Sequence, residues 1–184
     1  MLRAGGKREP LFFIFTFIIF YLLTASVVPY LGVRMNFLSF GGRIAQNIVK
    51  PDIMFALVLC SAILSVRRRT VILGIIFGFI VDVTCSVPMF SPLCYCLSAL
   101  YAGRLSFAFP GKGVLNAMFV AAPLLLLKAA VGTFYLLGTW HNISFTDIIF
   151  GAVLPEYIYN IIVVAIVYGI LSFLMKLFRI EKSI

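Results

Sequence analysis

The sequence is organised around the stretch Gly74-Ile-Ile-Phe-Gly-Phe-Ile-Val-Asp82, which places one carboxylate in an otherwise apolar run. An ionisable side chain in hydrocarbon costs roughly 2.5 to 3.5 kcal/mol on insertion scales, so it normally faces a protein interior or a polar cavity. We therefore expect Asp82 to point toward the helices on which this segment packs. Gly74 and Gly78 precede it on the same helix face. Small residues at this spacing let two helices approach closely, either inside the protein or at an interface with a partner.

The composition of the whole chain is that of an integral membrane protein. Of its 184 residues, 63% are hydrophobic and only 11% are charged, and the mean hydropathy is +1.14. One soluble core cannot bury this much apolar surface. Because roughly 20 apolar residues cross a bilayer as a helix, the length allows about six spans and little else. The sequence therefore predicts a single all-α polytopic membrane domain over residues 1–184, folded as a bundle of six transmembrane helices.

Six apolar segments are the candidates for these helices. The first follows a basic N-terminus and exceeds the about 7 to 15 residues of a signal-peptide core, so we interpret it as an uncleaved span. Residues 34–50 are expected to form the longest connector of the first half, and the segment before the last helix to lie at the membrane interface. The predicted spans are residues 11–33, 48–66, 70–87, 93–109, 114–138 and 155–178.

The net charge of +9 indicates the orientation of the bundle rather than a nucleic-acid-binding surface. If both termini lie in the cytoplasm, most of the 15 Lys and Arg residues fall on that side, including the run Arg67-Arg68-Arg69. The connector 34–50 then carries the basic residues that lie outside. Cytoplasmic loops carry an excess of Lys and Arg, so this distribution predicts an N-in/C-in topology.

Two helices are expected to begin with a proline followed by an acid. Pro51-Asp52 opens the second span and Pro155-Glu156 opens the last. Proline fits the first helical turn, and an acid is stabilised at the positive end of the helix dipole. We interpret both acids as helix-start residues in preference to catalytic ones. Asn160 lies one turn after Glu156 on the same face, where it is expected to hydrogen-bond across helices.

Lys128 is a second ionisable residue in the middle of a predicted span. At a rise of about 1.5 Å per residue, Asp82 and Lys128 lie roughly 18 and 21 Å from the cytoplasmic ends of their helices. These similar depths lead to the hypothesis that the two charges pair or share a polar cavity. In the alternative, Lys128 extends to the surface alone, and Asp82 is either protonated or satisfied by backbone groups and hydroxyls such as that of Thr84.

No catalytic or metal-binding motif accompanies these polar residues. His141 is the only histidine, and the chain lacks the zinc-protease, nucleophile-elbow and phosphate-loop patterns. The four cysteines show no metal-ligand spacing and are interpreted as buried small hydrophobic residues. They are Cys60, Cys85, Cys94 and Cys96. The sequence therefore predicts no enzyme activity, no metal and no cofactor.

Four parts of the sequence together resemble a known family. They are Pro51-Asp52, Gly78-Phe-Ile-Val-Asp82, the stretch Pro92-Leu-Cys-Tyr-Cys-Leu-Ser-Ala-Leu-Tyr-Ala-Gly103, and Asn160 in the last span. In size, span number and these motifs, the chain is similar to the family of rod-shape-determining membrane proteins MreD. It departs from the usual pattern at Ile80-Val81, where that family is richer in glycine before the acid.

The resemblance implies a non-enzymatic subunit of the bacterial cell-elongation complex, located in the cytoplasmic (inner) membrane among its lipids. The expected direct partner is MreC, in an assembly that also includes MreB, RodA and a class B penicillin-binding protein and makes peptidoglycan. The family is also similar in its helix arrangement to the substrate-binding subunits of energy-coupling-factor transporters. This leaves a second function open, a membrane transport subunit that binds a small molecule or lipid with Asp82 and Lys128 as contacts.

Overall fold

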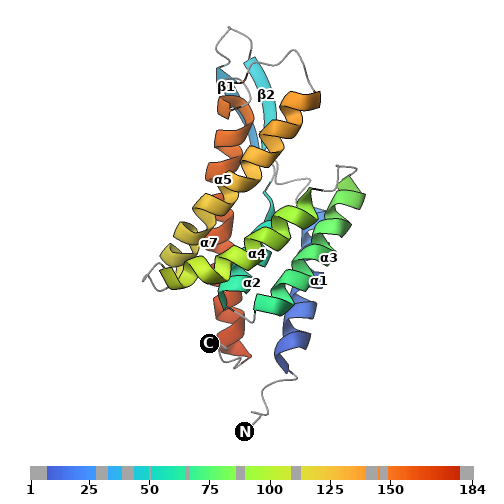
Figure 1. Ribbon diagram of the computed structural model, residues 1–184, viewed down its shortest axis with the longest axis vertical. Helices are drawn as coiled ribbons and strands as arrows, with labels where there is room; N and C mark the ends of the chain where they lie inside the picture. Colours follow the sequence, from blue (N-terminus) through green and yellow to red (C-terminus); the bar gives the residue numbers. More distant parts are fainter. Residues whose placement is uncertain are drawn as a thin grey trace.

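The computed structural model describes residues 8–27, 33–38, 44–49, 51–64, 67–85, 90–108, 113–139, 145 and 149–178. Within these residues the chain forms six α-helices, one two-stranded sheet and one π-helical turn (Figure 1). In chain order the elements are α1 (Arg8–Val27), β1 (Val33–Leu38), β2 (Ile44–Val49), α2 (Ile53–Leu64), α3 (Arg67–Cys85), α4 (Ser91–Ala108), α5 (Val114–Thr139), η2 (Ile149–Val153) and α7 (Leu154–Leu177).

The helical part of the prediction is confirmed from Arg67 onward. Helices α3, α4, α5 and α7 begin and end within a few residues of the segments predicted for them. Helix α7 starts at Leu154, with Pro155 in its first turn. The turn η2 leads into α7 from the segment that was expected to lie at the membrane interface.

The first half departs from the prediction, because the expected connector contains a β-hairpin. β1 and β2 pair antiparallel over their full length. Val33 lies in β1 and Ile48-Val49 lie in β2, so the predicted spans 11–33 and 48–66 are longer than the helices, which end at Val27 and begin at Ile53. Two short runs of strand-forming residues on either side of the sequence Gly41-Gly42 were the signal for this hairpin.

Helix α2 forms the centre of the bundle. It packs against α1, α3, α4, α5 and α7, and each of its residues from Met54 to Ala62 is buried. A helix that is apolar on all sides is typically buried in this way. Its 12 residues measure about 18 Å, against roughly 30 Å for the hydrocarbon core of a bilayer. Helix α2 is therefore a short core element and not a complete span by itself.

Two of the described helices are long and apolar enough to cross a membrane. They are Val114–Phe134 within α5, with a mean hydropathy of 2.0, and Leu154–Leu177, with a mean hydropathy of 2.3. Only 28% and 39% of their most apolar windows are buried, so most of this apolar surface lies on the outside of the bundle. The structure thus indicates a helical protein that associates with a membrane, while six complete spans stay a prediction.

The start of α1 lies beside the end of α7. The ring centroids of Phe12 and Phe178 are 5.6 Å apart, and both helix ends lie at the bottom of Figure 1. The two ends of the described chain are therefore on the same side of the bundle, as an N-in/C-in topology requires. Which side of a membrane they occupy stays a prediction.

Helices α3 and α4 approach closely at the two glycines. A Cβ atom at Gly78 would lie 2.7 Å from the Cα atom of Pro92, and one at Gly74 would lie 3.3 Å from Cγ1 of Val58 and 3.5 Å from the carbonyl oxygen of Tyr95. The contact at Gly78 leaves no room for a side chain, and the one at Gly74 is tight. The glycine pair therefore packs inside the protein, which was the first of the two predicted alternatives.

Replacing Gly78 by alanine is expected to destabilise the protein by about 1–3 kcal/mol, because the added methyl group meets backbone atoms of α4. Thermal unfolding of the purified chain in detergent measures the change. Gly132→Ala is the matched control, since a Cβ at Gly132 meets nothing within 4 Å. Equal stability of the two variants would contradict the close packing of α3 on α4.

Candidate functional site

Asp52 forms the start of helix α2 and is the centre of a polar cluster. Its Oδ1 atom accepts a hydrogen bond of 2.9 Å from the backbone N–H of Phe55, three residues later. This is the geometry of an N-cap, in which a short polar side chain satisfies an N–H group that has no partner within its helix. Pro51 is buried directly before it. The interpretation of Asp52 as a helix-start residue is confirmed.

Lys128 reaches Asp52 from the middle of helix α5. Its Nζ atom lies 2.5 Å from Oδ2 of Asp52 and 3.4 Å from Oε1 of Glu156. The same atom lies 5.4 Å from the centroid of the Phe55 ring, within range of a cation–π contact. Lys128 therefore joins the start of α2 to the first turn of α7, where Glu156 is located.

Two further side chains complete the coordination of Asp52. The hydroxyl of Tyr95 in α4 donates a hydrogen bond of 2.9 Å to Oδ1 of Asp52. The backbone N–H of Asp52 donates one of 2.8 Å to Oδ1 of Asn160 in α7. The hydrogen bond across helices predicted for Asn160 is thus confirmed. Because Asp52 also binds Lys128, this single residue connects α2 to α4, α5 and α7.

The charges of the cluster are unequally compensated. The side chains of Asp52 and Lys128 are 20% and 23% exposed, and their contact is short, so little water screens the attraction between them. Glu156 is 50% exposed and lies farther from the shared ammonium group. The three groups carry two negative charges and one positive charge. The excess negative charge is therefore located mainly on Glu156.

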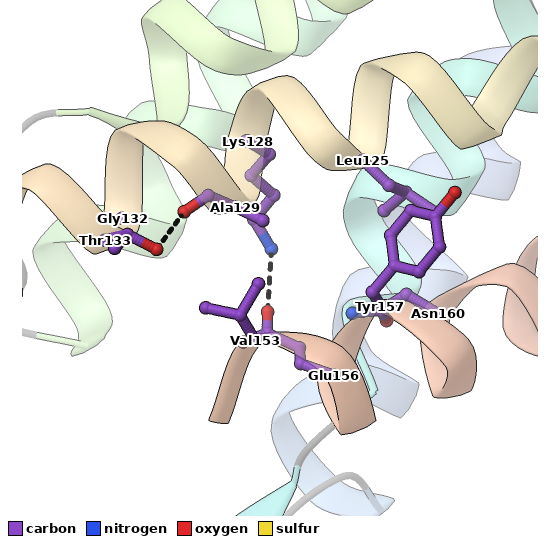
Figure 2. A pocket seen from close by; sticks show the side chains of 9 residues that line it. All are labelled: Leu125, Lys128, Ala129, Gly132, Thr133, Val153, Glu156, Tyr157 and Asn160. Atoms are coloured by element: carbon purple, nitrogen blue, oxygen red, sulfur yellow. Dashed lines mark hydrogen bonds and ion pairs between the residues drawn. The ribbon is translucent and has the colours of Figure 1, made fainter. Parts of the chain in front are cut away.

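A pocket of about 120 Å³ lies between α5 and α7 at this cluster (Figure 2). Lys128, Glu156 and Asn160 are among the residues that line it, and Leu125 and Val153 form part of its apolar wall. In Figure 2, Lys128 and Glu156 point toward one another from the two helices. The polar cluster is therefore accessible from the surface of the bundle on the side of Glu156.

The structure brings together half of the residues selected from the sequence. Asp52, Lys128, Glu156 and Asn160 belong to the cluster, with Pro51 next to it. The other three lie at the contact between α3 and α4: Gly74, Gly78 and Asp82.

The hypothesis that Asp82 pairs with Lys128 is wrong. Oδ2 of Asp82 accepts a hydrogen bond of 3.0 Å from the backbone N–H of Ser91, at the start of α4. Lys128 instead contacts Asp52 and Glu156. The alternative is confirmed in part, because a backbone group binds Asp82. Its other part, in which Lys128 extends to the surface without a partner, is also wrong. Similar depths in two helices do not imply that their side chains face each other.

Tyr95 is the functional residue of the cluster that sequence reasoning missed. It lies within the stretch from Pro92 to Gly103, but no role was assigned to it. A tyrosine in the middle of an apolar helix was the available signal, because a buried phenol usually has a hydrogen-bond partner. The sequence did not indicate that this partner is Asp52, which lies 43 residues earlier.

The described residues contain no group of three or more His, Cys, Asp or Glu side chains that could hold a metal ion. Cys60 and Cys94 are buried free thiols, as predicted, and Cys96 is a partly buried one. His141 and the side chains of Thr84 and Cys85 lie outside the described part of the chain.

Removing one member of the ion pair is expected to cost about 3–5 kcal/mol of unfolding free energy, because it leaves a mostly buried charge without its partner. Lys128→Met and Asp52→Asn are the single changes. The double variant should lose less unfolding free energy than the sum of the two single losses, by at least about 1 kcal/mol. Denaturant titration in detergent measures all three. As the control, the losses from Asp82→Asn and Lys128→Met should add in the double variant within about 0.5 kcal/mol. A larger coupling between Asp82 and Lys128 would contradict the observed pairing.

Tyr95→Phe is expected to lower the unfolding free energy by about 1.5–3 kcal/mol, because the charged carboxylate of Asp52 loses the hydrogen bond that the Tyr95 hydroxyl donates to it. The same denaturant titration measures this loss. Tyr101→Phe removes a hydroxyl from an exposed position on the same helix and should change stability by less than about 0.5 kcal/mol. Similar losses for the two variants would show that the contact of Tyr95 with Asp52 contributes nothing.

In comparisons with family models, curated proteins and solved structures, none matches the chain. We therefore infer its role from the contacts among its own residues.

Proposed function

We propose that the chain is a non-enzymatic membrane subunit of the bacterial cell-elongation machinery, of the MreD type, that binds MreC and helps to regulate peptidoglycan synthesis. In this role it is a multi-pass protein of the inner membrane with both termini in the cytoplasm. MreB, RodA and a class B penicillin-binding protein are its indirect partners.

The observation that carries this proposal is the way in which the motif residues contact one another. Asp52 binds Asn160 and Tyr95. A Cβ at Gly78 would meet Pro92, and Asp82 binds Ser91 directly before it. Each part of the sequence that resembles the MreD family thus contacts another such part. A common fold explains why residues so far apart in the chain occur together.

The polar cluster supports an architectural role rather than a catalytic one. All four hydrogen-bonding groups of Asp52, its two carboxylate oxygens, its N–H and its carbonyl oxygen, are used inside the bundle. Lys128 is held by two carboxylates. Groups with these contacts fix the positions of helices. They are not free to accept a proton from a substrate or to donate one to it.

The outer surface of the helices supports a location in the membrane. Large apolar side chains are exposed on α1, α3, α5 and α7, among them Phe15, Ile72, Phe134 and Ile166. Exposed apolar patches of this extent are found at membrane or protein interfaces. The contact between the start of α1 and the end of α7 supports the N-in/C-in topology, because the first and last described residues then lie on one side of the bundle.

The alternative function, a transport subunit of the energy-coupling-factor type, has one supporting observation in the pocket between α5 and α7. Its volume of about 120 Å³ is smaller than the roughly 300–1,000 Å³ of sites that enclose a small molecule. Asp82, one of the two expected ligand contacts, does not line it. The pocket is therefore weaker support for this alternative than the contacts among the motif residues are for the first proposal.

Co-purification tests the proposed function directly. The full chain, tagged and co-expressed with MreC of the same organism, is extracted from membranes in mild detergent and captured. We expect MreC to elute with it in a stable ratio, and an unrelated tagged polytopic membrane protein to retain none. Recovery of a folded, monodisperse chain without MreC would reject the proposal.

A further inference from the structure

Glu156 carries a negative charge that the protein compensates incompletely. Lys128 lies 2.5 Å from Asp52 but 3.4 Å from Glu156, so the ammonium group belongs mainly to Asp52. Only Oε1 of Glu156 takes part in this contact, and its side chain is half exposed at the pocket. An exposed carboxylate beside apolar surface attracts a cationic group that can donate hydrogen bonds to it.

Asn160 presents a free hydrogen-bond donor to the same pocket. Its residue is 2% exposed and lines the pocket one turn after Glu156. Its Oδ1 atom accepts the N–H of Asp52, but its amide nitrogen has no hydrogen-bond partner among the described residues. This nitrogen is not fully enclosed, unlike the unpartnered Oγ of Ser61 and Oδ1 of Asp82, so it can donate a hydrogen bond to an acceptor atom of a ligand in the pocket.

The order of these groups along α7 gives the pocket a direction. Glu156 lies in the first turn of α7, and Asn160 lies about 6 Å further along the helix at about 1.5 Å per residue. In the proposed membrane location, the first turn is near the lipid head groups and Asn160 is closer to the acyl chains. A ligand would therefore place its cation at Glu156 and its acceptor atoms deeper, at Asn160.

We propose that the pocket between α5 and α7 binds the head group of an ethanolamine-type phospholipid, with the ammonium group on Glu156 and a phosphate oxygen accepting from Asn160. In a bilayer, the ammonium of such a lipid lies outermost and the phosphate lies nearer to the chains, which is the order of the two side chains. The volume of about 120 Å³ admits a head group and not a whole lipid, whose chains lie against the apolar exterior.

The chemistry of the cluster discriminates among lipid head groups. A primary ammonium donates hydrogen bonds to Glu156, whereas a trimethylammonium has no N–H to donate. An anionic head group with no ammonium brings a second negative charge to a site that already has an excess of one. Ethanolamine lipids are therefore expected to bind better than choline or glycerol lipids with the same acyl chains.

Gly132 and Gly169 provide a matched pair of steric variants. Both lie in long apolar helices, and a Cβ at either position meets nothing within 4 Å. Gly132 lines the pocket and Gly169 does not. Gly132→Leu is thus expected to fill the pocket without disturbing the packing around it, while Gly169→Leu places the same side chain elsewhere on the surface.

The test is native mass spectrometry of the full chain in detergent, titrated separately with phosphatidylethanolamine, phosphatidylcholine and phosphatidylglycerol of identical acyl chains. We expect the ethanolamine lipid to bind about tenfold more tightly than the other two. Glu156→Gln and Gly132→Leu should each remove this preference, and Gly169→Leu should keep it. Equal binding of the three lipids, or a preference that survives Gly132→Leu, would overturn the proposal.

A soluble competitor distinguishes a lipid from a free small molecule. Phosphoethanolamine carries the same ammonium and phosphate without acyl chains, and it should not displace the lipid at comparable concentration. Displacement at that concentration would assign the pocket to a soluble ligand and overturn the lipid assignment. The inference rests on the proposed membrane location but not on MreC, so a chain that retains MreC and shows no head-group preference would reject the lipid site alone.

Discussion

The contact between Asp52 and Lys128 is the interaction on which the rest of the structure depends. Two opposite charges lie in an apolar bundle, where the loss of hydration costs each of them several kcal/mol unless both are paired and hydrogen-bonded. The groups that satisfy them come from α2, α4, α5 and α7. The pair can therefore be satisfied only when all four helices are in place. Such a contact therefore specifies the arrangement of the helices more strictly than apolar packing alone would.

Tyr95 connects this cluster to the glycine contact between α3 and α4. Its hydroxyl binds Asp52, and its ring lies 5.4 Å from that of Phe55 between centroids. Its backbone carbonyl is one of the two groups that a Cβ at Gly74 would contact, with the side chain of Val58. Helix α4 is thus held on one side by the close approach of α3 and on the other by the cluster. The two sets of residues selected from the sequence form one continuous system of contacts through Tyr95.

The interior and the exterior of the bundle have different roles. Inside, the charges are used to position helices, which leaves little chemistry for a substrate. Outside, the exposed apolar side chains of α5 and α7 fit a membrane and the binding of other membrane components. Glu156 lies between the two regions, because it contacts Lys128 and is also half exposed. The pocket between α5 and α7, which Glu156 lines, is therefore reached from outside without opening the bundle.

Sequence alone determined the helical segments from Arg67 onward to within a few residues, where the last helix begins, and that Asp52, Glu156 and Asn160 are placed near helix starts. These are local properties, since apolar runs, proline and dipole-stabilised acids act within a few residues. It also contained the signal for the hairpin, but continuous apolar character concealed the strand pairing of Ile48-Val49 with β1.

Only the tertiary structure decided which charges meet. Depth along the helix made Asp82 and Lys128 suitable partners, yet a depth gives no rotation about the helix axis and no crossing angle. Ser91 at the start of α4 binds Asp82, while α5 directs Lys128 to Asp52 and Glu156. Partners separated by 76 and 43 residues are selected by how helices pack in three dimensions, and no local pattern in the chain encodes that choice.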